Sequence, residues 1–120
     1  MAEIRVIARA LARAGKEEQL RNTLLGMLAP TRAEQGCRLY ELYESNHKGL
    51  FYFYEKWESQ DALDRHTKTP HYKQLTQNVR DLLEGAFEVN ILGSLGWFWL
   101  DFRDESITAK SCDDESTVRR

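Results

Sequence analysis

The residues best suited to chemistry lie in one short stretch, between positions 51 and 72. An aromatic run, Phe51-Tyr52-Phe53-Tyr54-Glu55-Lys56-Trp57, is followed by His66 and by Thr69-Pro70-His71-Tyr72. The stretch combines the largest aromatic surface of the sequence with a carboxylate and two imidazoles. Such a combination is typical of a pocket for a flat organic molecule.

The two histidines suit acid and base roles better than metal binding. They are not an i, i+4 pair, the spacing that places two imidazoles on one helix face. We expect His66 near a helix C-terminus, which favours the imidazolium, and His71 near a helix N-terminus, which favours the neutral ring. One could then donate a proton while the other accepts one. Both could equally be partly exposed residues at helix ends.

Glu55 shares a strand face with Phe53 and Trp57, so its carboxylate should be buried. A buried carboxylate must be paired or have a raised pKa. We favour a structural ion pair with Arg5 or Arg9 over an acid in a cleft.

The tyrosines are better candidates for ligand contact than the other aromatic residues. The hydroxyls of Tyr52, Tyr54 and Tyr72 need partners, whereas Trp57 and the phenylalanines are more often core residues. The sequence contains no Gly-rich phosphate loop, no nucleophile elbow and no defensible Ser-His-Asp or Cys-His motif. Flavin, nicotinamide and nucleotide cofactors therefore gain no support.

Composition predicts one domain and excludes several classes of partner. The chain has 120 residues, 42% of them hydrophobic, and a net charge of -2. Nothing in this charge balance favours a nucleic acid as a binding partner. The charged, alternating N-terminus matches neither a signal peptide nor a membrane span, so we expect a cytoplasmic protein. Cys37 and Cys112 are far apart and are expected to be reduced thiols.

The first half of the chain predicts a strand, a helix and a hairpin. Apolar residues alternate over 3–12, then recur at helical spacing from Lys16 over about twenty residues. Pro30 should kink this helix or end it early, and Gly36 is a plausible C-cap. Alternation over 37–44 and 50–57, joined by a short polar loop, predicts a β-hairpin.

The second half predicts two helices and a strand. Ser59 should cap a short helix, Thr69-Pro70 should start another that ends at Gly85, and 86–92 should be a strand. The order is that of the α+β, ferredoxin-like split βαβ fold, with a four-stranded antiparallel sheet and helices on one face.

Two features point beyond that fold. The strand over 50–57 is apolar on both faces, so its second face must meet the C-terminal segment or a second subunit. We divide the chain into a domain, residues 1–93, and a C-terminal extension, residues 94–120. In the extension, 97–102 should form a fifth strand, followed by a polar tail.

Several segments of the sequence resemble those of a known protein family. Glu55-Lys56-Trp57-Glu58-Ser59, Ala62-Leu63, His66 and Thr69-Pro70-His71-Tyr72-Lys73, preceded by Gly36-Cys37, are similar to the antibiotic biosynthesis monooxygenase (ABM) family, particularly its quinol monooxygenase type. The resemblance covers about residues 3–92. It implies a homodimeric αβ barrel, in which two ferredoxin-like sheets face each other.

The resemblance also implies an activity: oxidation of a small quinol or phenol by dioxygen without metal, flavin or haem. The family's Trp and His match Trp57 and His66, whereas Phe53 replaces an Asn of the polyketide-tailoring members. We predict His66, His71 and Glu55 as catalytic residues. Their neighbours Phe53, Trp57, Tyr54 and Tyr72 are the predicted substrate-binding residues.

Two alternatives remain open. The segments 52–55 and 66–73 are also similar to the isomerase of phosphorylated autoinducer-2 breakdown products, for which Lys68 or Lys73 could anchor a phosphate. A non-catalytic small-molecule binding module could use the same pocket.

Overall fold

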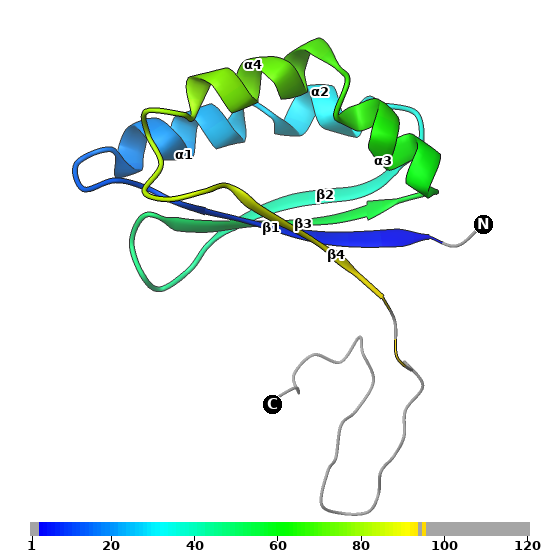
Figure 1. Ribbon diagram of the computed structural model, residues 1–120, viewed down its shortest axis with the longest axis horizontal. Coiled ribbons are helices and arrows are strands. Elements are labelled where there is room, and N and C mark those ends of the chain that lie inside the picture. The colour runs from blue at the N-terminus through cyan, green and yellow to red at the C-terminus, as the bar shows by residue number, and fades with distance from the viewer. Residues whose placement is uncertain (1–2, 94, 96–120) are drawn as a thin grey trace, which may run out of the picture.

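The computed structural model describes residues 3–93 and 95, and within them one antiparallel sheet carries all the helices on one face (Figure 1). The strands lie in the order β2-β3-β1-β4. The elements are β1 (Ile4–Leu11), α1 (Glu17–Leu25), α2 (Leu28–Arg32), β2 (Cys37–Glu44), β3 (Leu50–Trp57), α3 (Gln60–His66), α4 (Pro70–Asn78) and β4 (Glu88–Leu92). The predicted α+β, ferredoxin-like fold is confirmed.

Strict alternation along the two central strands builds the core. Val6 and Ala8 of β1 and Phe51 and Phe53 of β3 point to the helices, and each is at most 2% exposed. The register pairs Ala8 with Phe53, so a small residue lies beside a large one on the covered face. This complementarity lets the helices pack closely on the sheet.

The predicted first helix is two helices, because the chain breaks at Gly26-Met27. Pro30 is the third residue of α2 and has no N–H to offer the carbonyl of Gly26. The early end that the proline predicts is confirmed. Gly36 does not cap the helix, since Ala33 does, and it serves the next turn instead.

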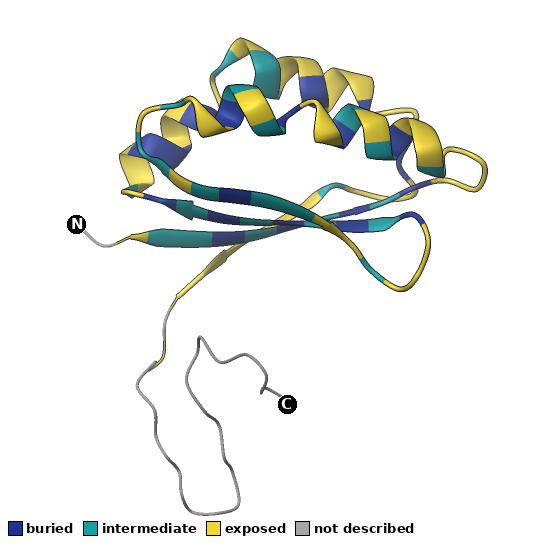
Figure 2. Cartoon of the chain, turned by 180° about the vertical axis from the view of Figure 1, so that it is seen from behind, coloured by how far each residue is buried: buried dark blue, intermediate teal, exposed yellow. Residues whose placement is uncertain are grey.

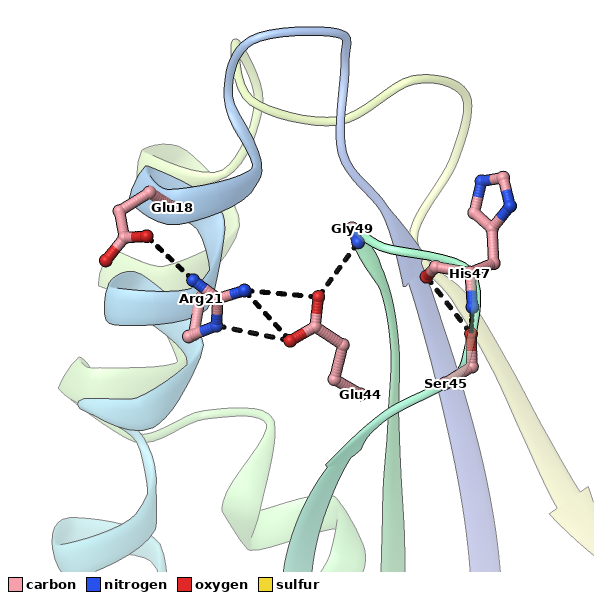
Figure 3. Close-up of polar contacts among 6 residues, drawn as sticks. All are labelled: Glu18, Arg21, Glu44, Ser45, His47 and Gly49. Atoms are coloured by element: carbon pink, nitrogen blue, oxygen red, sulfur yellow. Dashed lines mark hydrogen bonds and ion pairs between the residues drawn. The ribbon is translucent and has the colours of Figure 1, made fainter.

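A polar cluster fixes the β2–β3 hairpin against α1 (Figure 3). Arg21 of α1 binds Glu18 one turn away at 2.8 Å and Glu44 at the end of β2 at 2.9 Å. Glu44 also accepts a hydrogen bond from the backbone N–H of Gly49 at 2.9 Å. The predicted hairpin is confirmed, and Glu44 links its loop to α1.

Local capping chemistry sets the starts of α3 and α4. Ser59 Oγ accepts the N–H of Ala62, and Thr69 Oγ1 accepts the N–H of Tyr72, as predicted. The prediction that the last helix runs to Gly85 is wrong, because α4 ends at Asn78.

The residues after α4 join the edge of the sheet instead of extending the helix. The N–H of Arg13 bonds the carbonyl of Leu82, and the N–H of Glu84 bonds that of Leu11. Leu82 and Leu83 are buried, as their apolar character requires, but in a turn. Helical spacing could not distinguish these two ways of burying them.

Within the described residues, no helix covers the second face of the sheet (Figure 2). Tyr52 and Tyr54 lie on that face half-buried, and Tyr43 is 53% exposed. The predicted cover by a second subunit stays a prediction. The fifth strand expected over 97–102 lies outside the described residues, and no described helix is long and apolar enough to cross a membrane.

Candidate functional site

Two histidines and a glutamate form a compact cluster where α2 and α3 end and α4 begins. Oε2 of Glu34 lies 2.8 Å from Nδ1 of His66 and 2.6 Å from Nε2 of His71. Both distances are those of charge-assisted hydrogen bonds. The carboxylate thus joins two imidazoles whose ring centres are 6.1 Å apart.

The turn between α2 and β2 brings Glu34 to this position. Gly36 has φ +94°, and a Cβ built there would lie 2.6 Å from Cβ of Ala62 on α3. Its carbonyl accepts the N–H of Glu58 at 2.8 Å. Only glycine lets the turn approach α3 so closely. This approach sets Glu34 beside the end of α3, where His66 lies.

The short link between α3 and α4 positions the two histidines. His66 is the last residue of α3, and His71 follows Pro70, the first residue of α4. Thr69 Oγ1 donates to the carbonyl of His66 at 2.8 Å while it caps α4. One threonine therefore connects both helix ends.

His66 is a buried base whose tautomer follows from its hydrogen bond. A carboxylate only accepts, so Nδ1 of His66 carries the proton and Nε2 keeps its lone pair. The ring packs 4.6 Å from that of Trp57 and 5.0 Å from that of Tyr72. Burial lowers the pKa of His66, and the opposing pull of Glu34 does not cancel this. The expectation that the helix end favours the imidazolium is therefore wrong, because burial is the stronger effect.

Glu55 is buried without the arginine partner that we expected. Its Oε1 accepts the indole N–H of Trp57 at 2.9 Å. Arg5 and Arg9 lie on the opposite face of the sheet, where they pair with Glu3 and Glu88. Burial raises the pKa of Glu55 to about 7, against the lowering effect of the Trp57 bond, and the charge of Glu34 adds to the rise. The predicted ion pair is wrong. Glu55 instead accepts a hydrogen bond from an indole, and its carboxyl has a pKa of about 7.

A cavity of about 30 Å³ connects these groups between the sheet and the helices. Its wall is mostly apolar, with a few titratable side chains. The lining residues are Val6, Ala8, Tyr40, Glu55, Leu63, His66, Thr67, Tyr72, Leu75, Phe87 and Val89. Burial raises the pKa values of Tyr40 and Tyr72, helped in both by the charge of Glu55, so both hydroxyls stay protonated at neutral pH.

A second, more open hollow lies on the other side of the cluster, between α1 and α4. This groove has a volume of about 310 Å³. It is lined by Asn22, Thr23, Gly26, Met27, His71, Gln74, Leu75 and Asn78. His71 lines the groove and not the cavity, whereas His66 lines the cavity and not the groove.

The structure places only some of the predicted site residues at the cavity. His66, Glu55 and Tyr72 line it. Phe53 and Trp57 are core residues, at most 1% exposed, that pack behind the cavity wall. Tyr54 lies on the opposite face of the sheet.

Sequence reasoning missed Glu34 and Tyr40. Glu34 is 32 positions from His66, in a turn with no motif of its own. Tyr40 lies between Leu39 and Glu41 in β2, where neither strand face is clearly apolar, and it gave no signal besides its aromatic ring. The nearest clue to Glu34 was Gly36, whose role we assigned to a helix end.

The cluster also has the donors of a metal site. One ligand atom each from Glu34, His66 and His71 lies within 4.8 Å of the others, and two imidazoles with a carboxylate suit several divalent metals. The distances from Oε2 of Glu34 to the two imidazole nitrogens are those of hydrogen bonds, so this oxygen already has two partners.

Comparison with known proteins agrees with this architecture. The family model described as "Antibiotic biosynthesis monooxygenase" matches residues 3–78. The Mycobacterium tuberculosis protein named "Putative monooxygenase Rv0793" is 41% identical over 92 residues, which are 77% of this chain and 91% of that protein. Its solved structure has a TM-score of 0.75 and covers 79% of this chain and 97% of its own. The crystal structure of PA3566 from Pseudomonas aeruginosa matches with a TM-score of 0.74 and 33% sequence identity. The match covers 80% of this chain and 97% of the PA3566 chain.

The fold is that of a small α+β domain with a buried cluster of titratable side chains between the described sheet and helices. The chain belongs to the antibiotic biosynthesis monooxygenase family.

Proposed function

We propose that this protein is a cofactor-independent monooxygenase that oxidises a small quinol or phenol with dioxygen. The observation that carries the proposal is His66, a buried neutral imidazole that Glu34 holds by Nδ1 at the wall of an apolar cavity. Family membership supports the reaction class, as does the name "Putative monooxygenase Rv0793" of the Mycobacterium tuberculosis relative.

Proton removal from the substrate would fall to His66. Its Nε2 accepts the phenolic proton, and the resulting imidazolium is stabilised by the carboxylate of Glu34 at 2.8 Å. The phenolate is electron-rich and can react with dioxygen. One oxygen atom enters the ring and the other leaves as water, so a phenol becomes a quinone. The substrate supplies all the electrons, so the overall reaction of phenol and dioxygen to quinone and water needs no external reductant.

Three further groups would assist at the cavity. Protonated Tyr40 and Tyr72 can donate hydrogen bonds to the phenolate oxygen as it forms. Glu55, with its pKa raised to about 7, can supply or accept a proton at the reduced oxygen. The apolar remainder of the wall excludes water, which strengthens these interactions.

The cavity must widen to admit an aromatic ring. At about 30 Å³ it has room for one or two waters, whereas benzene has been held by an engineered cavity of roughly 150 Å³. The side toward β4 is the weakest wall, since Val89 is 47% exposed although it lines the cavity. We propose that a substrate enters there, and that a second subunit on the bare sheet face makes the homodimer.

The isomerase alternative gains nothing from the cavity. A phosphorylated ketose needs a cationic anchor, but Lys68 and Lys73 are exposed and neither lines the cavity. A binding module without turnover would use the same wall, and only an assay separates it from an enzyme.

The test is oxygen consumption by chelator-treated protein with a panel of hydroquinones and naphthols. We expect turnover that falls roughly 10²-fold or more in His66→Gln, the usual scale for a positioned base. The matched control is His47→Gln, since His47 is exposed in the hairpin loop. Full turnover in His66→Gln would remove the assignment of the base. Silence of the wild type on all phenols would instead favour the binding module.

A further inference from the structure

The cluster of Glu34, His66 and His71 offers the ligand set of a zinc ion. One ligand atom from each side chain lies within 4.8 Å of the other two. Because Glu34 comes from a different part of the chain, the two histidines need not be an i, i+4 pair. Zinc is bound by imidazole nitrogens and carboxylate oxygens, and three protein ligands leave its fourth position to water. Magnesium and calcium prefer oxygen ligands, so two imidazoles favour zinc over either of them.

The three ligand atoms can enclose an ion after modest movements. Oε2 of Glu34 lies 2.8 Å from Nδ1 of His66 and 2.6 Å from Nε2 of His71, with a proton between the atoms of each pair. In a tetrahedral zinc site, neighbouring ligand atoms are about 3.3 Å apart, so these two distances must lengthen by roughly 0.5–0.7 Å while the nitrogens approach each other. His71 can make most of this adjustment, since its side chain is 24% exposed and that of His66 only 3%.

The groove between α1 and α4 gives an ion access to the cluster. Its volume of about 310 Å³ has room for a metal ion with several waters, and His71 is part of its lining. Apart from His71, the described residues that line the groove carry no ionisable side chain that would hold the ion elsewhere. The amides of Asn22 and Gln74 can hydrogen-bond the waters that stay on the metal. On the other side, the ring of His66 packs against that of Trp57, so zinc enters from the groove.

We propose that Glu34, His66 and His71 bind one zinc ion, and that the bound zinc removes the base function of His66. A neutral imidazole that binds a metal through Nδ1 carries its proton on Nε2. Zinc therefore moves the ring proton of His66 to Nε2, the nitrogen whose lone pair would accept the phenolic proton. His71 binds through Nε2 and moves its proton to Nδ1, while Glu34 binds as a carboxylate. The three side chains together gain and lose no proton, and zinc is an inhibitor of the reaction and not its cofactor.

Zinc binding itself is measured by calorimetry on the whole, chelator-treated chain, and it does not depend on the proposed function. We expect one zinc ion per chain. His71→Gln can still donate a hydrogen bond to Glu34 but lacks the imidazole ligand, so its affinity should fall at least as much as the roughly 10–100-fold that loss of a second-shell partner costs. The matched control is His47→Gln, which removes an exposed imidazole and should bind zinc like the wild type. No binding by the wild type, or equal affinity in His71→Gln, would overturn the proposal.

Two further measurements locate the ion. Circular dichroism shows whether each variant is folded, and Glu34→Gln, which removes the anionic ligand, tests the same site if His71→Gln does not fold. ¹⁵N NMR of the ring nitrogens should show the proton of His66 moving from Nδ1 to Nε2 when zinc binds, while the ring of His47 is unchanged. Zinc binding that leaves the His66 ring unaltered would place the ion elsewhere and overturn the proposal.

Inhibition rests on the proposed function and is therefore measured separately, by oxygen consumption. With a phenol that the wild type oxidises, saturating zinc should stop turnover and a chelator should restore it, and His47→Gln should behave in the same way. Continued turnover by the zinc-loaded protein would overturn the inhibitory role. A wild type that is silent on all phenols would sink the proposed function, and calorimetry and NMR would still decide whether zinc binds and moves the proton of His66.

Discussion

Replacing Glu55 with Gln should stabilise the protein at alkaline pH and leave it almost unchanged in acid. The folded protein raises the pKa of this carboxyl from 4.5 to about 7, so the native state binds the proton more tightly than the unfolded chain does. Native stability therefore falls as pH rises from about 4.5 to about 7. At 1.36 kcal/mol for each pKa unit, the loss is about 3 kcal/mol. Gln cannot ionise, keeps an oxygen for the indole of Trp57, and escapes this loss.

The assay is urea unfolding of the wild type and of Glu55→Gln at intervals between pH 4.5 and 8.5. The difference between the two free energies of unfolding is the quantity that matters. His66 contributes the opposite slope, because burial lowers its pKa and stability rises as its proton leaves, but this slope is common to both proteins. Glu58→Gln controls for removal of a carboxylate, since Glu58 is exposed.

We expect the difference to grow with pH and to level off above about pH 7 at a few kcal/mol. A difference that is constant over the whole pH range would contradict a raised pKa of Glu55, because it would mean that Glu55 ionises alike in the folded and unfolded chains. A variant less stable than the wild type at pH 8 would show that the ionised carboxylate has a partner that Gln cannot replace.

Three other substitutions test the supports of the site by urea unfolding. Gly36→Ala should lower the free energy of unfolding by about 2 kcal/mol or more, because φ is +94° and the new Cβ would collide with Ala62. Gly15→Ala has a similar φ but meets no atom within 4 Å, so it should lower the free energy of unfolding by only about 1 kcal/mol. Equal losses would show that the close approach to α3 is unimportant. Thr69→Ala should cost about 1 kcal/mol with its cap, and an unchanged midpoint would contradict the capping role. Trp57→Phe removes a donor to Glu55 and should lower the free energy of unfolding by about 1–3 kcal/mol more at pH 8 than at pH 5. Equal losses at the two pH values would show that the bond does not favour the ionised carboxylate.

Local chemistry predicted most of the fold. The side-chain oxygens of Ser59 and Thr69 indicate where two helices start. The alternation along β1 and β3 indicates which residues lie on the same face of the sheet. The end of α4 could not be predicted, because Leu82 is equally well buried by a helix or by the turn that pairs with the end of β1.

The site was less predictable than the fold. The sequence indicated His66 and Glu55, because titratable residues among large apolar ones are unusual. It could not indicate Glu34, whose role depends on how closely the turn at Gly36 approaches α3. The partner of Glu55 was misjudged for a similar reason, since the strand register that places Arg5 on the other face is a property of the assembled sheet.

The most direct test of the proposed monooxygenase reaction is a labelling experiment. Chelator-treated protein is given ¹⁸O₂ and a hydroquinone, and the product is analysed by mass spectrometry for the wild type and for His66→Gln. We expect the wild type to form a hydroxyquinone that carries one ¹⁸O atom, and His66→Gln to form much less of it. A product without ¹⁸O, or one formed equally well by His66→Gln, would contradict it.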